Sequence, residues 1–88
     1  MTTQDIVIKW LVSRANSSDP WFFSYNLESE VPAYGRLAHG KTHTASTYSR
    51  VFRKIRENNI LKKYGLTLEE VKHKDNEKVK GWKVVKDS

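Results

Sequence analysis

Cysteine is absent from the sequence, which excludes a disulfide framework and every metal site built on thiolates. No apolar run approaches the roughly 20 residues that a membrane-spanning helix needs. The first residues also lack the basic segment and the apolar segment of a secretory signal. These absences predict a soluble, cytoplasmic protein.

Positive charge is scarce in the first half of the chain and concentrated in the second half. Residues 1–40 carry three basic and four acidic side chains, whereas residues 41–88 carry 13 basic and six acidic ones. Because 88 residues make one domain, this asymmetry predicts one strongly basic face on a single small domain. Such a face is typical of proteins that bind nucleic acid and, second, of proteins that bind anionic membranes. A lysine-rich surface that serves only solubility is the alternative.

Proline occurs only twice, and the first proline is expected to end a helix. The segment 3–16 before Pro20 predicts that helix, with Thr2 or Thr3 as its N-cap. The apolar face of this helix consists of Ile6, Val7, Trp10 and Leu11.

The second proline is expected to close a short second helix. "WFFSY" predicts a brief extended segment, after which Ser24 can cap a helix over 24–31. Pro32 disfavours helical backbone at the residue before it, so we expect the helix to end there. Residues 32–43 are then expected to form a linker with two glycines.

The stretch "GRLAHGKT" at 35–42 fits the phosphate-binding loop pattern G-x-x-x-x-G-K-[ST]. A working loop of this kind follows a buried strand, and here the preceding "ESEVPAY" holds two acids and a proline. No apolar strand ending in an acid is present to hold magnesium. We therefore expect no nucleotide binding. Lys41 and Thr42 are expected either to contact a nucleic-acid phosphate or to form an inert loop.

The clearest helix is predicted over 44–58, begun by Thr44 or Ser46. One apolar side is formed by Tyr48, Val51, Phe52 and Ile55. The opposite side holds Ser46, Arg50, Arg53 and, at its far end, Glu57, and it is flanked by Ser49 and Lys54. Small hydroxyl residues allow close approach to a groove, and arginine can grip guanine or phosphate. The alternative is an ordinary amphipathic helix whose charged side faces solvent.

The tail predicts a β-hairpin over 66–86, because β-forming residues flank the turn sequence "DNEK". A short helix from Leu68 is the alternative, since Thr67 and Glu70 have the spacing of a capping box.

The order of these elements resembles the winged helix-turn-helix family over nearly the whole chain. "STYSRVFRKIRENNIL" is similar to a recognition helix and its closing turn, with Asn59 where the family usually has glycine. "FSYNLESEV" is similar to the short second helix, and "GWKVVK" to the last strand of the wing. The 32–43 linker is longer than a standard turn of this motif. The resemblance implies an α+β fold, mainly α, in which three helices and a C-terminal hairpin wing form one domain over 1–88.

The resemblance also implies binding to double-stranded DNA, with helix 44–58 in the major groove, by a small regulator of transcription or replication. The residues expected to contact DNA are Lys41, Thr42, Ser46, Ser49, Arg50, Arg53, Lys54, Lys72, Lys74 and Lys78. We expect no enzymatic activity, cofactor, metal or membrane partner, and a homodimer is possible. His39, His43 and His73 lack the companions of a metal site.

Two other functions fit the same sequence. Phe22 and Phe23 are adjacent and cannot both point inward from an extended segment, so one is expected to be exposed. The aromatic patch 21–25 could therefore bind a partner protein on the same fold. The third possibility is an RNA binder.

Overall fold

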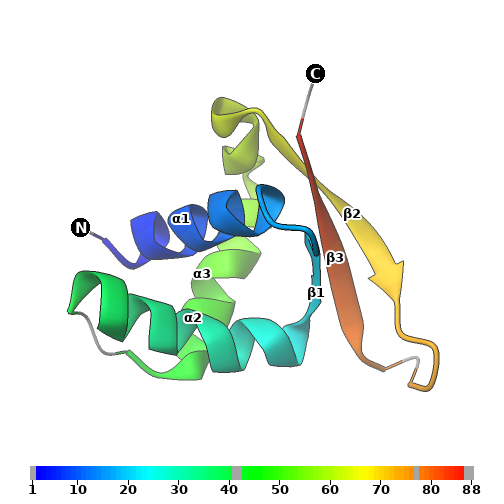
Figure 1. Ribbon diagram of the computed structural model, residues 1–88, viewed down its shortest axis with the longest axis horizontal. Coiled ribbons are helices and arrows are strands. Elements are labelled where there is room, and N and C mark those ends of the chain that lie inside the picture. The colour runs from blue at the N-terminus through cyan, green and yellow to red at the C-terminus, as the bar shows by residue number, and fades with distance from the viewer. Residues whose placement is uncertain (1, 41–42, 77, 87–88) are drawn as a thin grey trace.

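The computed structural model describes residues 2–40, 43–76 and 78–86, which form helices beside a small antiparallel sheet (Figure 1). The helices are α1 (Thr3–Ala15), α2 (Ser24–His39), α3 (Ala45–Glu57) and the 3-10 helix η1 (Ile60–Tyr64). The strands are β1 (Trp21–Phe23), β2 (Leu66–Lys72) and β3 (Lys80–Lys86), in the spatial order β1–β3–β2. This architecture confirms the predicted α+β class with mainly helical content.

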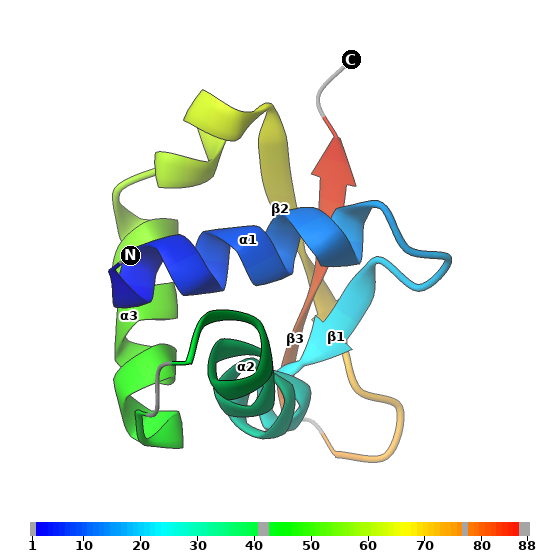
Figure 2. The same ribbon diagram turned by 60° about the vertical axis from the view of Figure 1, so that its left-hand side comes forward.

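The helices pack against one face of the sheet. In Figure 1, α1 and α2 lie side by side and α3 crosses behind them. Figure 2 shows α2 nearly end-on, with α3 to one side and the sheet to the other. The β2–β3 hairpin extends beyond the helices in both views. Within the described part of the chain, no helix has the length and apolar character needed to cross a membrane.

Helix α1 begins as predicted, with Thr2 as its N-cap. The Thr2 hydroxyl accepts the Asp5 amide at 3.2 Å, and the Asp5 carboxylate accepts the Thr2 amide at 3.0 Å. These reciprocal bonds satisfy two amides that the first turn of a helix leaves without partners. They also lower the pKa of Asp5, chiefly through the Thr2 backbone amide.

Arg14 connects α1 to both neighbouring elements. Its Nε and Nη2 donate to the Trp21 carbonyl of β1 at 3.3 and 3.0 Å. Its Nη1 lies 3.3 Å from the Glu30 carboxylate of α2. The Pro20 carbonyl, just before β1, accepts the amide of Val84 at 2.8 Å. The short strand β1 is therefore held by a side chain as well as by the sheet.

Aromatic rings form the centre of the core. Phe22 is fully buried and meets Trp10 edge-on, with the ring centroids 4.9 Å apart. Phe52 of α3 lies 5.0 Å from Trp82 of β3 and 5.7 Å from Phe22. Because side chains alternate along a strand, burial of Phe22 turns Trp21 toward solvent, where it is 46% exposed. Phe22 and Phe23 do not both point inward, as expected, but Phe23 is half-buried rather than exposed.

The prediction of a short helix over 24–31 and a linker over 32–43 is wrong. Helix α2 continues through Pro32 to His39, and Phe23 rather than Ser24 is its N-cap. A proline inside a helix removes one hydrogen bond and costs about 3 kcal/mol. Burial of Leu27 and Val31 on the same helix offsets this cost.

The end of α2 lies at a glycine rather than at the proline. Gly40 has φ +64, in the left-handed region that glycine adopts without strain. Its amide donates to the Arg36 carbonyl at 3.1 Å and so closes the last turn. The connection to α3 is consequently much shorter than the predicted linker.

The C-terminal hairpin is confirmed, and the alternative helix from Leu68 is wrong. Strand β2 pairs with β3 from Leu66↔Lys86 to Lys72↔Lys80. Before it, Asn59 adopts φ +50 at the end of α3, which asparagine tolerates better than most residues. Asparagine can therefore serve at this position, where the resemblance would expect glycine.

Candidate nucleic-acid interface

Three hydroxyl side chains start helix α3. The Thr44 hydroxyl accepts the Thr47 amide at 3.4 Å and lies 2.9 Å from the Thr47 hydroxyl. The Ser46 hydroxyl is 3.0 Å from that of Thr44. This N-cap brings a compact polar group, instead of long side chains, to the first turn of α3.

Buried apolar side chains fix the rotation of α3 about its axis. Tyr48 and Ile55 are fully buried and Phe52 is 2% exposed. The opposite side of the helix must therefore face solvent, because α3 turns by about 100° per residue. Ser46, Arg50, Arg53 and Lys54 are exposed there, and Ser49 is half-buried. We call these five residues the α3 face, and the structure brings all of them together as predicted.

The cations of the α3 face differ in their contacts. Arg53 Nε pairs with the Glu57 carboxylate at 3.0 Å, and these side chains are 73% and 60% exposed. Such an exposed pair is worth at most about 1 kcal/mol, so a phosphate or a base can displace it. Among the described residues, Arg50 and Lys54 have no ion-pair partner. The α3 face thus offers cations that are not committed to the fold.

Arg56, although it lies on α3, is not part of the α3 face, and its side chain packs against the core. Its guanidinium carbon lies 5.0 Å from the centroid of the Phe52 ring and 4.7 Å from that of Trp82. Burial lowers the pKa of Arg56, and the nearby charge of Arg53 lowers it further. Its Nε is buried and makes no hydrogen bond within the described chain. Arg56 is therefore a packing residue.

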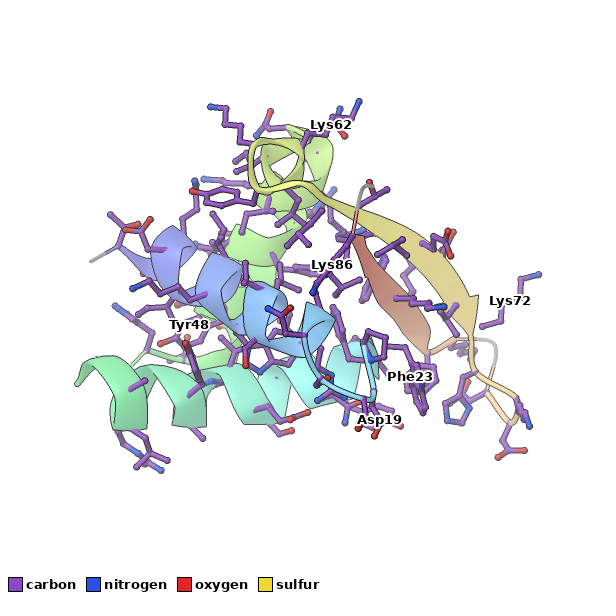
Figure 3. All side chains as sticks on the ribbon, turned by 45° about the horizontal axis from the view of Figure 1, so that its top comes forward. Asp19, Phe23, Tyr48, Lys62, Lys72 and Lys86 are labelled. Carbon is purple, nitrogen blue, oxygen red and sulfur yellow. The ribbon has the colours of Figure 1, made fainter. Side chains whose placement is uncertain are left out.

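The predicted hairpin lysines form a separate basic group. Lys72, Lys74 and Lys78 are all exposed at the end of the hairpin. Figure 3 shows Lys72 projecting into solvent from the end of β2. In Figures 1 and 2 this end of the hairpin lies well apart from α3. The expected contacts thus divide into two surfaces rather than one continuous patch.

The phosphate-binding loop pattern occupies the end of a helix. Gly35 lies inside α2 and Gly40 follows its last residue. A phosphate-binding loop instead precedes a helix, whose N-terminal amides point at the anion. Lys41 and Thr42 lie outside the described residues, so their predicted contacts remain predictions.

Two described histidines contact aromatic rings. The His43 ring meets Tyr48 edge-on, with the centroids 5.8 Å apart. The His73 ring lies 4.9 Å from Phe23. No cluster of three or more potential metal ligands occurs among the described residues.

The sequence analysis missed the part that His73 plays in an aromatic group on the sheet. Phe23, Tyr25 and His73 pack together although 48 positions separate Tyr25 from His73. These residues meet because β1 and β2 both pair with β3 in a particular register. The sequence alone does not determine that register, so it could not predict this group.

The α3 face and the hairpin lysines are the two basic surfaces from which a function can be inferred. No protein-family model matches the sequence, and no match is found among curated proteins or among solved structures. The functional assignment therefore depends on the geometry of these two surfaces.

Proposed function

We propose that this protein is a winged helix-turn-helix domain that binds double-stranded DNA and regulates transcription or replication. Helix α3 lies in the major groove, and the β2–β3 hairpin is the wing that reaches an adjacent groove or row of phosphates. The element order α1–β1–α2–α3–β2–β3 and the antiparallel sheet support this proposal.

One observation carries the proposal. Burial of Tyr48, Phe52 and Ile55 commits one side of α3 to the core and leaves Arg50, Arg53 and Lys54 in solvent. The first turn of the same side carries hydroxyls, which permit close approach to base edges. Arginine can bind guanine O6 and N7 with two hydrogen bonds, and such a contact discriminates between bases by about 1–3 kcal/mol.

A gel-shift series with duplex DNA, duplex RNA and single-stranded DNA tests the proposal. We expect duplex DNA to bind most tightly, with a log–log salt slope of about −0.9 per neutralised phosphate. The double variant Arg50→Ala/Arg53→Ala should lose duplex affinity in a sequence-dependent way. Lys9→Ala/Lys86→Ala is the matched control, because it removes two exposed charges from α1 and β3.

Other outcomes would redirect the assignment. Equal losses on all DNA sequences would assign Arg50 and Arg53 to phosphates instead of bases. Preference for duplex RNA would overturn the DNA proposal. If no nucleic acid binds at low salt, the partner is a protein, and the exposed Trp21 and Tyr25 mark its docking surface.

A further inference from the structure

The face of the sheet that points away from the helices carries aromatic side chains. In the register, Trp21 pairs with Lys83 and Phe23 pairs with Gly81. On the other side of β3, Val71 also pairs with Gly81. Because Phe22 and Trp82 face the core, these alternate residues must lie on the outer face.

Gly81 makes room for the central ring of this group. A Cβ atom at position 81 would lie 2.5 Å from Cδ1 of Phe23, so the ring rests directly on the strand. Phe23 stacks on Tyr25 with a centroid distance of 5.6 Å and an interplanar angle of 21°. His73 meets Phe23 edge-on at 4.9 Å. We call Trp21, Phe23, Tyr25 and His73 the outer aromatic cluster.

The cluster is solvent-accessible and has cations beside it. Trp21 is 46% and Tyr25 49% exposed. A hollow of about 310 Å³ lies elsewhere, near Arg56, whereas the hollow at this cluster measures about 570 Å³. Three rings and three cations line the larger hollow: Trp21, Phe23, His73, Lys72, Lys74 and Lys83. Asp75 is the one acid among its described lining residues.

We infer that the outer aromatic cluster is a second nucleic-acid site, which binds an unpaired stretch of DNA. Exposed rings stack on bases that have left a duplex, and neighbouring lysines neutralise the strand's phosphates. Paired bases are stacked inside a duplex, so a duplex offers these rings no free base. On the outer face, Lys83 pairs with Trp21 and lines the same hollow, which places stacking and charge together. Figure 3 shows Phe23 beside the hairpin end, with the Lys72 side chain projecting away from it.

Charge argues against a second copy of this chain as the occupant. Self-association through the cluster would bring two lysine-rich rims together, with Lys72, Lys74 and Lys83 in each. A DNA strand instead supplies both the negative charge and the flat apolar rings. The second site does not require α3 to bind a duplex, and it rests on the proposed function only in the choice of DNA over RNA.

The experiment titrates the full chain with oligothymidine, which has no duplex form. Binding is followed by anisotropy of a labelled oligonucleotide and by tryptophan emission. Trp21 is the accessible reporter, because Trp10 and Trp82 are only 6% and 8% exposed. We expect oligothymidine to quench the Trp21 emission. Trp21→Ala and Tyr25→Ala should each weaken binding by about five- to 150-fold.

Two control variants separate this site from α3. Arg50→Ala/Arg53→Ala should bind oligothymidine as the wild type does, while it loses duplex affinity. Lys83→Ala removes the cation that pairs with Trp21, leaves every ring in place, and should weaken oligothymidine binding with a reduced salt slope. Circular dichroism of each variant checks that the fold is retained.

The inference is overturned if oligothymidine does not bind at low salt, or if Trp21→Ala/Tyr25→Ala binds it as tightly as the wild type. Preferential binding of single-stranded RNA would overturn the choice of DNA. Dimerisation that Trp21→Ala abolishes, or a protein that competes for Trp21, would assign the cluster to that partner instead. If duplex binding persists in any of these cases, the role of α3 stands and only the second site fails.

Discussion

Arg56 and Trp82 form a cation–π contact that ties the end of α3 to the middle strand of the sheet, with the guanidinium carbon 4.7 Å from the ring centroid. Arg56 also covers Phe52, so its side chain shields two core rings from water. Removing it should therefore affect stability more than removing a cation of the α3 face.

We expect Arg56→Ala to lower the free energy of unfolding by about 1–3 kcal/mol, measured by urea denaturation. Arg56→Met keeps an apolar stem and removes a partly desolvated charge, so its effect should stay within about 1 kcal/mol. Arg50→Ala on the same helix is the control and should change stability by less than about 0.5 kcal/mol. Equal effects of Arg56→Ala and Arg50→Ala would contradict a packing role for Arg56.

Glu57 competes with DNA for Arg53 if α3 binds a duplex. Glu57→Gln removes the 3.0 Å ion pair and one negative charge from the end of the α3 face. We expect duplex affinity to rise about 1.5- to fivefold, and stability to change by less than about 1 kcal/mol. Fluorescence anisotropy with a fixed duplex measures the first, and urea denaturation the second. A fall in affinity would mean that Glu57 itself contacts a base.

Tyr48 predicts a sensitivity to alkaline pH. Its hydroxyl is buried without a hydrogen-bond partner within the described chain, and burial raises the pKa of Tyr48 above 10.0. A raised pKa means that the folded state favours the neutral phenol. This contribution is complete below pH 10.0 and is lost as the pH rises through the folded-state pKa.

Tyr48→Phe should remove that alkaline loss and, at neutral pH, stabilise the fold by about 1 kcal/mol, because no polar group is then left unsatisfied. Thermal unfolding between pH 7 and pH 11 measures both effects. Tyr25→Phe is the matched control, since Tyr25 is 49% exposed. If Tyr48→Phe is destabilising at neutral pH, the hydroxyl has a partner in solution.

Substitution of Gly81 is expected to cause a steric clash. An alanine Cβ would meet Phe23 at 2.5 Å and the Phe22 carbonyl at 3.2 Å. We expect Gly81→Ala to lower stability by about 1–3 kcal/mol and to displace the Phe23 ring. Gly81→Ala/Phe23→Ala should recover part of the loss relative to Phe23→Ala alone, as a double-mutant cycle by urea denaturation would show. Additive effects would mean that the two residues do not meet.

Replacing Pro32 by alanine is expected to raise the stability of the fold. Alanine at position 32 restores an amide that can donate to the Glu28 carbonyl inside α2, and we expect an increase of about 1–3 kcal/mol in unfolding free energy. Pro32→Gly is the comparison, and it should be about 1 kcal/mol less stable than Pro32→Ala. A loss of stability in Pro32→Ala would show that α2 needs the bend that proline introduces.

Periodicity and capping residues were sufficient to predict α1 and α3, and β-forming residues around a turn sequence predicted the hairpin. In α3 the apolar residues recur at helical spacing, so burial of Tyr48 and exposure of Arg50 follow from one pattern. The prediction that Pro32 ends the second helix failed. A proline inside a helix costs only a few kcal/mol, and burial of side chains such as Val31 against the rest of the fold stabilises the helix by more than that.

Contacts between residues far apart in the sequence could not be predicted from local sequence patterns. The outer aromatic cluster depends on the register that puts Phe23 and Val71 on either side of Gly81. A shift by one residue would turn each of these side chains to the other face. For Arg56, the sequence does place its side chain at the edge of the apolar side of α3, but only the position of Trp82 shows that it folds inward.

Residues 16–20 connect α1 to β1, and Arg14 also links the two elements directly. Its side chain donates hydrogen bonds from α1 to the Trp21 carbonyl at the start of β1. The length of that connection therefore does not set where the strand lies. Residues 16–19 are exposed, and added residues there would loop outward while both ends stay anchored. This corner is where evolution, or an engineer attaching a tag, can lengthen the chain with the least disturbance to the architecture.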